Sequence, residues 1–296
     1  MLTVVVVFVA LIAGAAVTGD VLTRPAQHGV GPSPASLPAE SLTLQTRAGE
    51  TVASWLIRGK TGCGAVLLVH GVRADRRDMV GRAIYLRSLG YTVLLIVLPA
   101  HGESSGTHIT YGLQEARGVE AALDYLTRES PREHTGVIGV SLGGAALLLA
   151  KLTKPPNAVV LESVYPTIDE ALTNRLALYL GPVGKPLAPL LTWQLPLRLG
   201  ISADQLRPID AIHKLAAPVL IISGGNDQHT TREQTERLFA AAHEPKELWI
   251  VDGAAHVDLH SFGQLDYQKR VAAFMGKYLR TDSEDLASQV HCTDAK

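Results

Sequence analysis

The chain has 296 residues, a formal net charge of −1 and two cysteines. This length suits one large α/β domain with a buried core, and the balanced charge gives no electrostatic footprint for nucleic acid. The cysteines, Cys63 and Cys292, lie far apart in the sequence without metal-ligand spacing. The sequence therefore predicts neither a zinc site nor a disulfide framework, and a single bond between the two cysteines stays open.

Residues 1–19 form an apolar segment without a charged side chain. At this length a transmembrane helix is a candidate, so we expect a single membrane anchor. A signal peptide is the alternative, because residues 13–15 have the small side chains of a cleavage site, although no basic region precedes them. After cleavage the protein would be secreted or periplasmic. Membrane orientation stays open, because Arg24 is the only nearby positive charge.

Residues 20–40 are rich in proline and glycine, a composition that favours an extended linker without a core of its own. The folded domain is expected over residues 41–280. The polar segment 281–296 is expected to be a flexible tail.

The folded domain begins with two segments, 41–46 and 51–57, that alternate apolar and polar side chains and predict an antiparallel hairpin. Unbroken apolar runs follow, which are typical of strands covered by helices on both faces. These runs lie at residues 65–69, 92–98, 135–140, 158–161, 219–222 and 247–251. Segments with helical spacing lie between or after them, at residues 75–89, 113–127, 142–152, 232–242 and 265–278. The alternation predicts an α/β fold with a mostly parallel, doubly wound sheet, whose site lies at the carboxyl ends of the strands.

Residues 165–207 interrupt this alternation, because they contain leucine-rich pieces broken by prolines and no recognisable strand. We expect a small helical cap above the sheet that forms the apolar wall of a substrate pocket. Ordinary connecting helices packed on the core are the alternative.

The most informative stretch is Gly139-Val140-Ser141-Leu142-Gly143, which has a predicted strand before it and a predicted helix after it. A nucleophilic serine at such a turn needs small residues two positions away on either side, because the backbone is crowded there. The start of the helix also favours developing negative charge. Without these flanks, the same pattern would indicate an ordinary turn.

A serine hydroxyl becomes a nucleophile when a histidine takes its proton and a carboxylate orients that histidine. Asp227 is the predicted acid, because it follows the 219–222 strand through a glycine-rich turn. Glu162, directly after the 158–161 strand, is the rival acid.

His256 is the predicted base, because it follows the last strand and directly precedes the final helical segment. The chain has eleven histidines. Several others are expected to be surface or supporting residues on loops or helices, namely His101, His108, His229, His243 and His260.

Two backbone N–H groups are expected to hold the oxyanion of the reaction, those of Leu142 and Val72. Val72 lies in the loop after the first parallel strand, which reads His70-Gly71-Val72. Gly71 allows the backbone to approach the site closely, and His70 is expected to orient the loop by hydrogen bonding.

Together these segments resemble the α/β-hydrolase superfamily, and most closely its serine-aminopeptidase-like, monoacylglycerol-lipase-like branch. The likeness rests on residues 70–72 and 99–106, on the Ser141 turn, and on Asp227 and His256. It covers residues 42–279 and implies an eight-stranded fold, a helical cap after the sixth strand, and Ser141, Asp227 and His256 as a catalytic triad. Gly118 departs from related helices, which often carry an aspartate there, and we attach no catalytic consequence to it.

The sequence thus predicts a serine hydrolase that cleaves a carboxylic ester, as esterases and lipases do, through an acyl-Ser141 intermediate. Such a reaction needs no cofactor and no metal, and the expected substrate is a small acyl ester or lipid-like molecule. A serine peptidase or amidase is the alternative, because the same triad cleaves both bonds. A membrane-tethered, non-catalytic scaffold with a vestigial triad is a second, less favoured alternative.

Overall fold

A computed structural model describes residues 2–281 of the chain, so Cys292 and nearly all of the predicted tail lie outside the described part. An eight-stranded sheet runs through the molecule in the spatial order β10-β9-β8-β7-β4-β5-β3-β2. Its strands are β2 (Glu40–Gln45), β3 (Thr51–Ile57), β4 (Ala65–Val69), β5 (Thr92–Ile96), β7 (Thr135–Val140), β8 (Ala158–Glu162), β9 (Val219–Gly224) and β10 (Lys246–Val251). The β2–β3 and β3–β5 pairs are antiparallel and the other pairs are parallel, so the predicted α/β fold with a mostly parallel sheet is confirmed.

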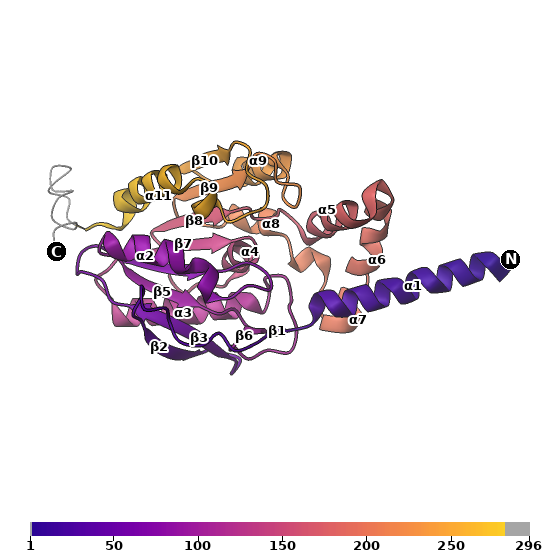
Figure 1. Cartoon of the computed structure of the whole chain (residues 1–296), viewed down its shortest axis with the longest axis horizontal. Helices are drawn as coiled ribbons and strands as arrows, with labels where there is room; N and C mark the ends of the chain where they lie inside the picture. Colours follow the sequence, from indigo (N-terminus) through magenta and orange to yellow (C-terminus); the bar gives the residue numbers. More distant parts are fainter. Residues whose placement is uncertain (1, 282–296) are drawn as a thin grey trace.

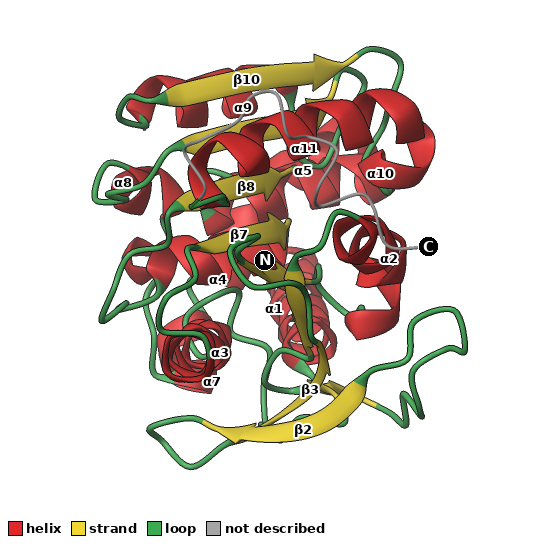
Figure 2. Ribbon diagram, turned by 90° about the vertical axis from the view of Figure 1, so that its left-hand side faces the viewer, coloured by secondary structure: helices red, strands yellow, loops and turns green. Residues whose placement is uncertain are grey.

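Helices cover both faces of this sheet (Figure 2). One face carries α2 (Val80–Ser88) and α11 (Gln264–Leu279), and the other carries α3 (Glu115–Glu129), α4 (Leu142–Leu149) and α9 (Arg232–Ala241). Shorter helical segments complete the domain, namely η1 (Arg76–Met79), α8 (Pro208–Ile212) and α10 (Leu259–Phe262).

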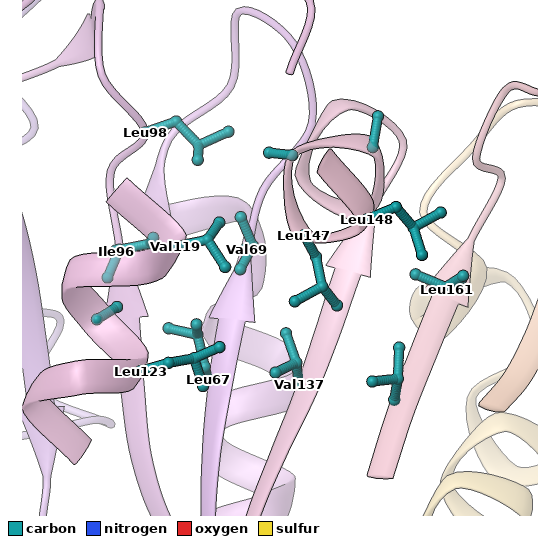
Figure 3. Close-up of a cluster of buried hydrophobic side chains, with 14 of the residues drawn as sticks. Leu67, Val69, Ile96, Leu98, Val119, Leu123, Val137, Leu147, Leu148 and Leu161 are labelled. Atoms are coloured by element: carbon teal, nitrogen blue, oxygen red, sulfur yellow. The ribbon is translucent and has the colours of Figure 1, made fainter. Parts of the chain in front are cut away.

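Successive residues of a strand point to opposite faces of the sheet, and in β4 both faces are buried. Leu67 and Val69 pack in the cluster under α3 and α4, which Figure 3 shows in close-up. Val66 and Leu68 pack in the cluster under α2 and α11. This double burial explains why the central strands read as unbroken apolar runs.

The segment after β8 folds into short helices that lie beside the sheet, next to α1 (right in Figure 1). They are α5 (Ile168–Leu180), η2 (Gly181–Leu187), α6 (Ala188–Thr192), α7 (Leu195–Leu199) and η3 (Ala203–Gln205), and we call them the cap. Their apolar side chains form a cluster separate from the two sheet clusters, built around Ile168, Leu172, Leu191, Leu195 and Leu206. The cap therefore has a small core of its own.

The N-terminal segment departs from the expected membrane anchor. Residues Leu2–Thr23 form helix α1, yet among the residues that the structure describes, no helix meets the length and apolarity needed to cross a bilayer. The predicted membrane location is therefore wrong. The end of α1 packs on the cap instead, because Gln194 donates a hydrogen bond to the carbonyl of Ala15 at 3.0 Å and Arg198 donates one to the carbonyl of Ala16.

Residues 20–40 also differ from the expected extended linker. Leu37 is fully buried and Val30 nearly so. The short strand β1 (Ala26–Gln27) pairs with β6 (His101–Gly102) in a second, two-stranded sheet. Proline and glycine shape this segment locally, but its few apolar side chains still bind it to the domain surface.

Candidate active site

Ser141 lies at the turn between β7 and α4, at the carboxyl edge of the sheet. Its backbone has φ 49° and ψ −111°, a conformation that a non-glycine residue adopts only when its surroundings enforce it. A Cβ atom at Gly143 would lie 2.5 Å from the carbonyl oxygen of Val69, and one at Gly139 would lie 2.7 Å from Cα of Gly144. The two glycines thus allow the turn to pack directly against neighbouring backbone, and the serine side chain is left at the edge.

Asp227 and His256 come from the ends of β9 and β10 and form a hydrogen bond of 2.7 Å between Oδ2 and Nδ1. Asp227 is buried, and its other oxygen accepts hydrogen bonds from the amides of His229 at 2.8 Å and Thr230 at 2.9 Å. Burial by itself would raise the pKa of Asp227, but the hydrogen bond from His256 and those two amides outweigh it and lower the pKa. An ionised Asp227 favours the tautomer that carries the proton on Nδ1, so Nε2 of His256 is left as a base.

The loop after β4 is fixed by His70. The amide of Leu98 donates to Nε2 at 3.0 Å, so Nδ1 carries the proton and donates to the carbonyl of Gly71 at 2.7 Å. Burial of the ring, with the neighbouring His101, lowers the pKa of His70 to about 3, so the ring stays neutral. A Cβ atom at Gly71 would lie 3.8 Å from Cβ of Ser141, which places this loop beside the serine.

Two cavities meet at Ser141. The small cavity, of about 90 Å³, has Leu142, Ile168 and Leu172 in its wall. The large cavity, of about 710 Å³, runs towards α2 and the loop after β10. Both are lined by Val72, Ser141, Arg175, His229 and His256. The structure therefore brings the predicted serine, histidine and Val72 loop together around one point.

Glu162, the rival acid, has different partners. Arg82 binds both of its carboxylate oxygens, at 3.0 and 2.6 Å, and the Tyr267 hydroxyl donates to it at 2.5 Å. Arg82 also forms an ion pair of 2.7 Å with Asp258, two residues after His256. The sequence did not indicate Arg82 as the partner of Glu162, because an isolated arginine in a predicted amphipathic helix usually lies on the solvated face.

The other histidines divide by burial. His108 and His243 are exposed. His101 and His260 are buried, and His229 has its ring centroid 4.9 Å from that of His256. Burial, with the nearby His256 and Arg175, lowers the pKa of His229. His229 is therefore a neutral part of the wall beside the predicted base.

Two residues of the small cavity had no sequence signal. Leu22 belongs to residues 20–40, where an extended linker was expected, and Arg175 lies on α5 of the cap. Within residues 2–281, no group of three or more histidine, cysteine or acidic side chains is arranged to hold a metal ion.

Comparison with known proteins gives three findings. The sequence model described as the alpha/beta hydrolase family matches residues 66–274. An uncharacterized protein of Mycobacterium tuberculosis is 32% identical over 236 residues, which are 77% of each chain. The solved structure of an esterase from Pyrococcus furiosus superposes with a TM-score of 0.72, at 19% identity and over 87% of this chain and 98% of that one. At that identity the superposition shows a shared fold.

Proposed function

The chain belongs to the α/β hydrolase family, and we propose that it is a serine hydrolase that cleaves carboxylic esters through an acyl-Ser141 intermediate. The predicted superfamily is confirmed, and its serine-aminopeptidase-like, monoacylglycerol-lipase-like branch stays a prediction. The observation that carries the proposal is the 2.7 Å hydrogen bond between Asp227 and His256 beside a serine at φ 49°.

In the proposed reaction, Nε2 of His256 takes the Ser141 proton while Oγ attacks the ester carbonyl. The imidazolium then donates this proton to the leaving alcohol. The neutral imidazole later takes a proton from the water that cleaves the acyl-enzyme, and returns it to Ser141 Oγ as the carboxylic acid leaves. Asp227 keeps His256 in the required tautomer and stabilises its positive charge. No metal or cofactor takes part.

The carbonyl oxygen gains negative charge in both steps, and the proposed donors to it are the amides of Val72 and Leu142. Leu142 is the first residue of α4, where the helix leaves amides without intrahelical partners. The His70 hydrogen bonds hold the Val72 loop rigid, so its amide is preorganised for this role.

Ester chemistry is favoured over peptide chemistry by the solved structures of the same fold that are named esterases, among them that of Pyrococcus furiosus and an esterase domain from Rhodothermus marinus. The proposed substrate is a small-molecule ester whose acyl part enters the small cavity. A serine peptidase or amidase would prefer an aminoacyl amide over a short acyl ester of the same length.

Turnover of p-nitrophenyl esters by purified Ser141→Ala tests the proposal. We expect both the initial burst of p-nitrophenol release and the steady-state turnover to disappear. The circular dichroism spectrum and the melting temperature should stay unchanged. A fluorophosphonate probe should label the unaltered protein at Ser141 and leave the variant unlabelled. Retained turnover or labelling in the variant contradicts the assignment, and a higher rate on aminoacyl amides moves it to a peptidase or amidase.

A further inference from the structure

Arg175 reaches the reaction centre from the cap. It lies on α5, is half-buried, and lines both cavities beside Ser141. Within residues 2–281 its guanidinium has neither an ion-pair nor a hydrogen-bond partner. Arg82, the buried arginine in the lining of the large cavity, is by contrast paired with Glu162.

The small cavity has a surplus of positive charge. Arg73 and Arg175 both lie in its lining, and among the described residues that lining contains no aspartate or glutamate. Arg73 donates to backbone carbonyls at the end of α1, including that of Arg24 at 3.4 Å, and within residues 2–281 it forms no ion pair.

Two buried carboxylates, those of Asp227 and Glu115, have hydrogen-bond partners of their own. Asp227 is held by His256 and by two amides. Glu115, under the small cavity, is fully buried and accepts hydrogen bonds from the amides of Thr110 and Gly112 and from the Thr110 hydroxyl. Neither is free to pair with Arg175.

The large cavity differs in this respect. Its lining includes the acidic residues Asp78, Glu162 and Asp258. The same lining holds Arg77, Arg82 and Arg175, and Arg82 forms ion pairs with both Glu162 and Asp258, so acids and arginines occur together on that side of Ser141.

From this contrast we propose that the small cavity receives an acyl group that ends in an anion, a carboxylate or a phosphate-like group, which binds Arg175. The inference rests on the proposed function and narrows its substrate class to esters of dicarboxylic or phosphorylated acids. A guanidinium binds such planar or tetrahedral anions through two parallel hydrogen bonds. The apolar wall of Ile168 and Leu172 would contact the methylene groups between the ester and the anion.

A matched pair of substrates tests the inference, the p-nitrophenyl ester of valeric acid and the mono-p-nitrophenyl ester of glutaric acid. Both have five-carbon acyl groups and the same leaving group, and they differ in a terminal methyl or carboxylate. With spontaneous hydrolysis subtracted, we expect kcat/KM to be about 10- to 100-fold higher for the glutarate ester, since hydrogen bonds to charged groups are worth that much. The ester of 4-phosphonobutyric acid, measured in parallel, shows which anion is preferred.

Arg175→Gln should reduce the ratio of the anionic to the neutral ester to about one. The matched control is Arg207→Gln, because Arg207 follows the cap, pairs with Asp210 and lines neither cavity. The control should keep the ratio. Equal rates on all three esters, or an unchanged ratio in Arg175→Gln, overturn the inference while the hydrolase assignment stands. If none of the three esters is hydrolysed, the proposed function itself fails.

Discussion

The two sides of Ser141 are built in different ways. On the sheet side, Ser141, Asp227 and His256 follow the ends of three parallel strands, so the backbone of the sheet positions them. On the cap side, the wall comes from side chains of α5 and from Leu22 of α1, which pack in a cluster outside the sheet core. The reactive groups therefore depend on the hydrogen-bonded backbone of the sheet, and the substrate wall depends on a small, separate apolar cluster.

This difference predicts that substitutions on the sheet side change turnover of every ester, whereas those on the cap side change the preference among esters. The predictions below test this separation, beginning with the largest expected effect.

Asp227→Asn should lower kcat by about 10⁴-fold on every ester, because an amide oxygen and NH₂ group no longer fix the required tautomer of His256. Steady-state rates on esters of two chain lengths measure the effect. The control is Glu162→Gln, which weakens the buried pair with Arg82 and should lower stability more than rate. The opposite ranking of the two rates would move the catalytic acid to β8.

Gly143→Ala should lower turnover of all esters by about 100-fold, because the new methyl group would lie 2.5 Å from the Val69 carbonyl oxygen and push Ser141 out of place. The matched control is Gly276→Ala in α11, where the nearest atom would lie 3.9 Å away. That control should raise the free energy of unfolding by up to about 1 kcal/mol, since alanine favours helix. Thermal unfolding and ester assays on both variants separate the two effects, and wild-type activity in Gly143→Ala would show that the turn is loosely packed.

Acidification should destabilise the sheet side through His70. Its pKa is about 3 in the folded chain and near 6.5 when unfolded, so the unfolded chain binds the extra proton between these values. Stability is therefore fully present above pH 6.5 and decreases as the pH falls towards 3. Between pH 7 and pH 5 we expect a loss of about 2 kcal/mol, measured by urea unfolding.

His70→Gln should be less stable at pH 7 and should lose this part of the pH dependence. The exposed His108 provides the control, because His108→Gln should keep the wild-type slope. Equal slopes in all three proteins would show that His70 is protonated without unfolding, and that the loop beside Ser141 is open to water.

Leu22→Ala should give the smallest effect, a shift of the preferred acyl chain towards longer esters by about tenfold in the ratio of kcat/KM values. Leu22 lines the small cavity, whereas its exposed neighbour Val21 does not. Val21→Ala is therefore the matched control. If Leu22→Ala lowered the rates of short and long esters equally, the end of α1 would support the reaction centre and the two sides of Ser141 would not be separable.

Much of the fold and the order of the candidate residues could be predicted from the sequence, because the signals are local. A strand buried on both faces is an unbroken apolar run, as in residues 65–69, and the glycines around Ser141 are required by contacts within the same turn and the adjacent strand. The parallel order of the strands then predicts that Asp227 and His256 follow strand ends at one edge of the sheet.

Only the tertiary structure decided the partners that lie far apart in the chain. Residue patterns favoured Asp227 over Glu162 as the acid, but they could not show that Glu162 binds the buried Arg82, 80 residues before it. They also predicted a membrane anchor at residues 1–19, where apolar composition alone does not reveal that Gln194 and Arg198 bind the end of α1. The physical reason is the same in both cases, since the environment of a charged or apolar side chain is set by which distant surface packs against it.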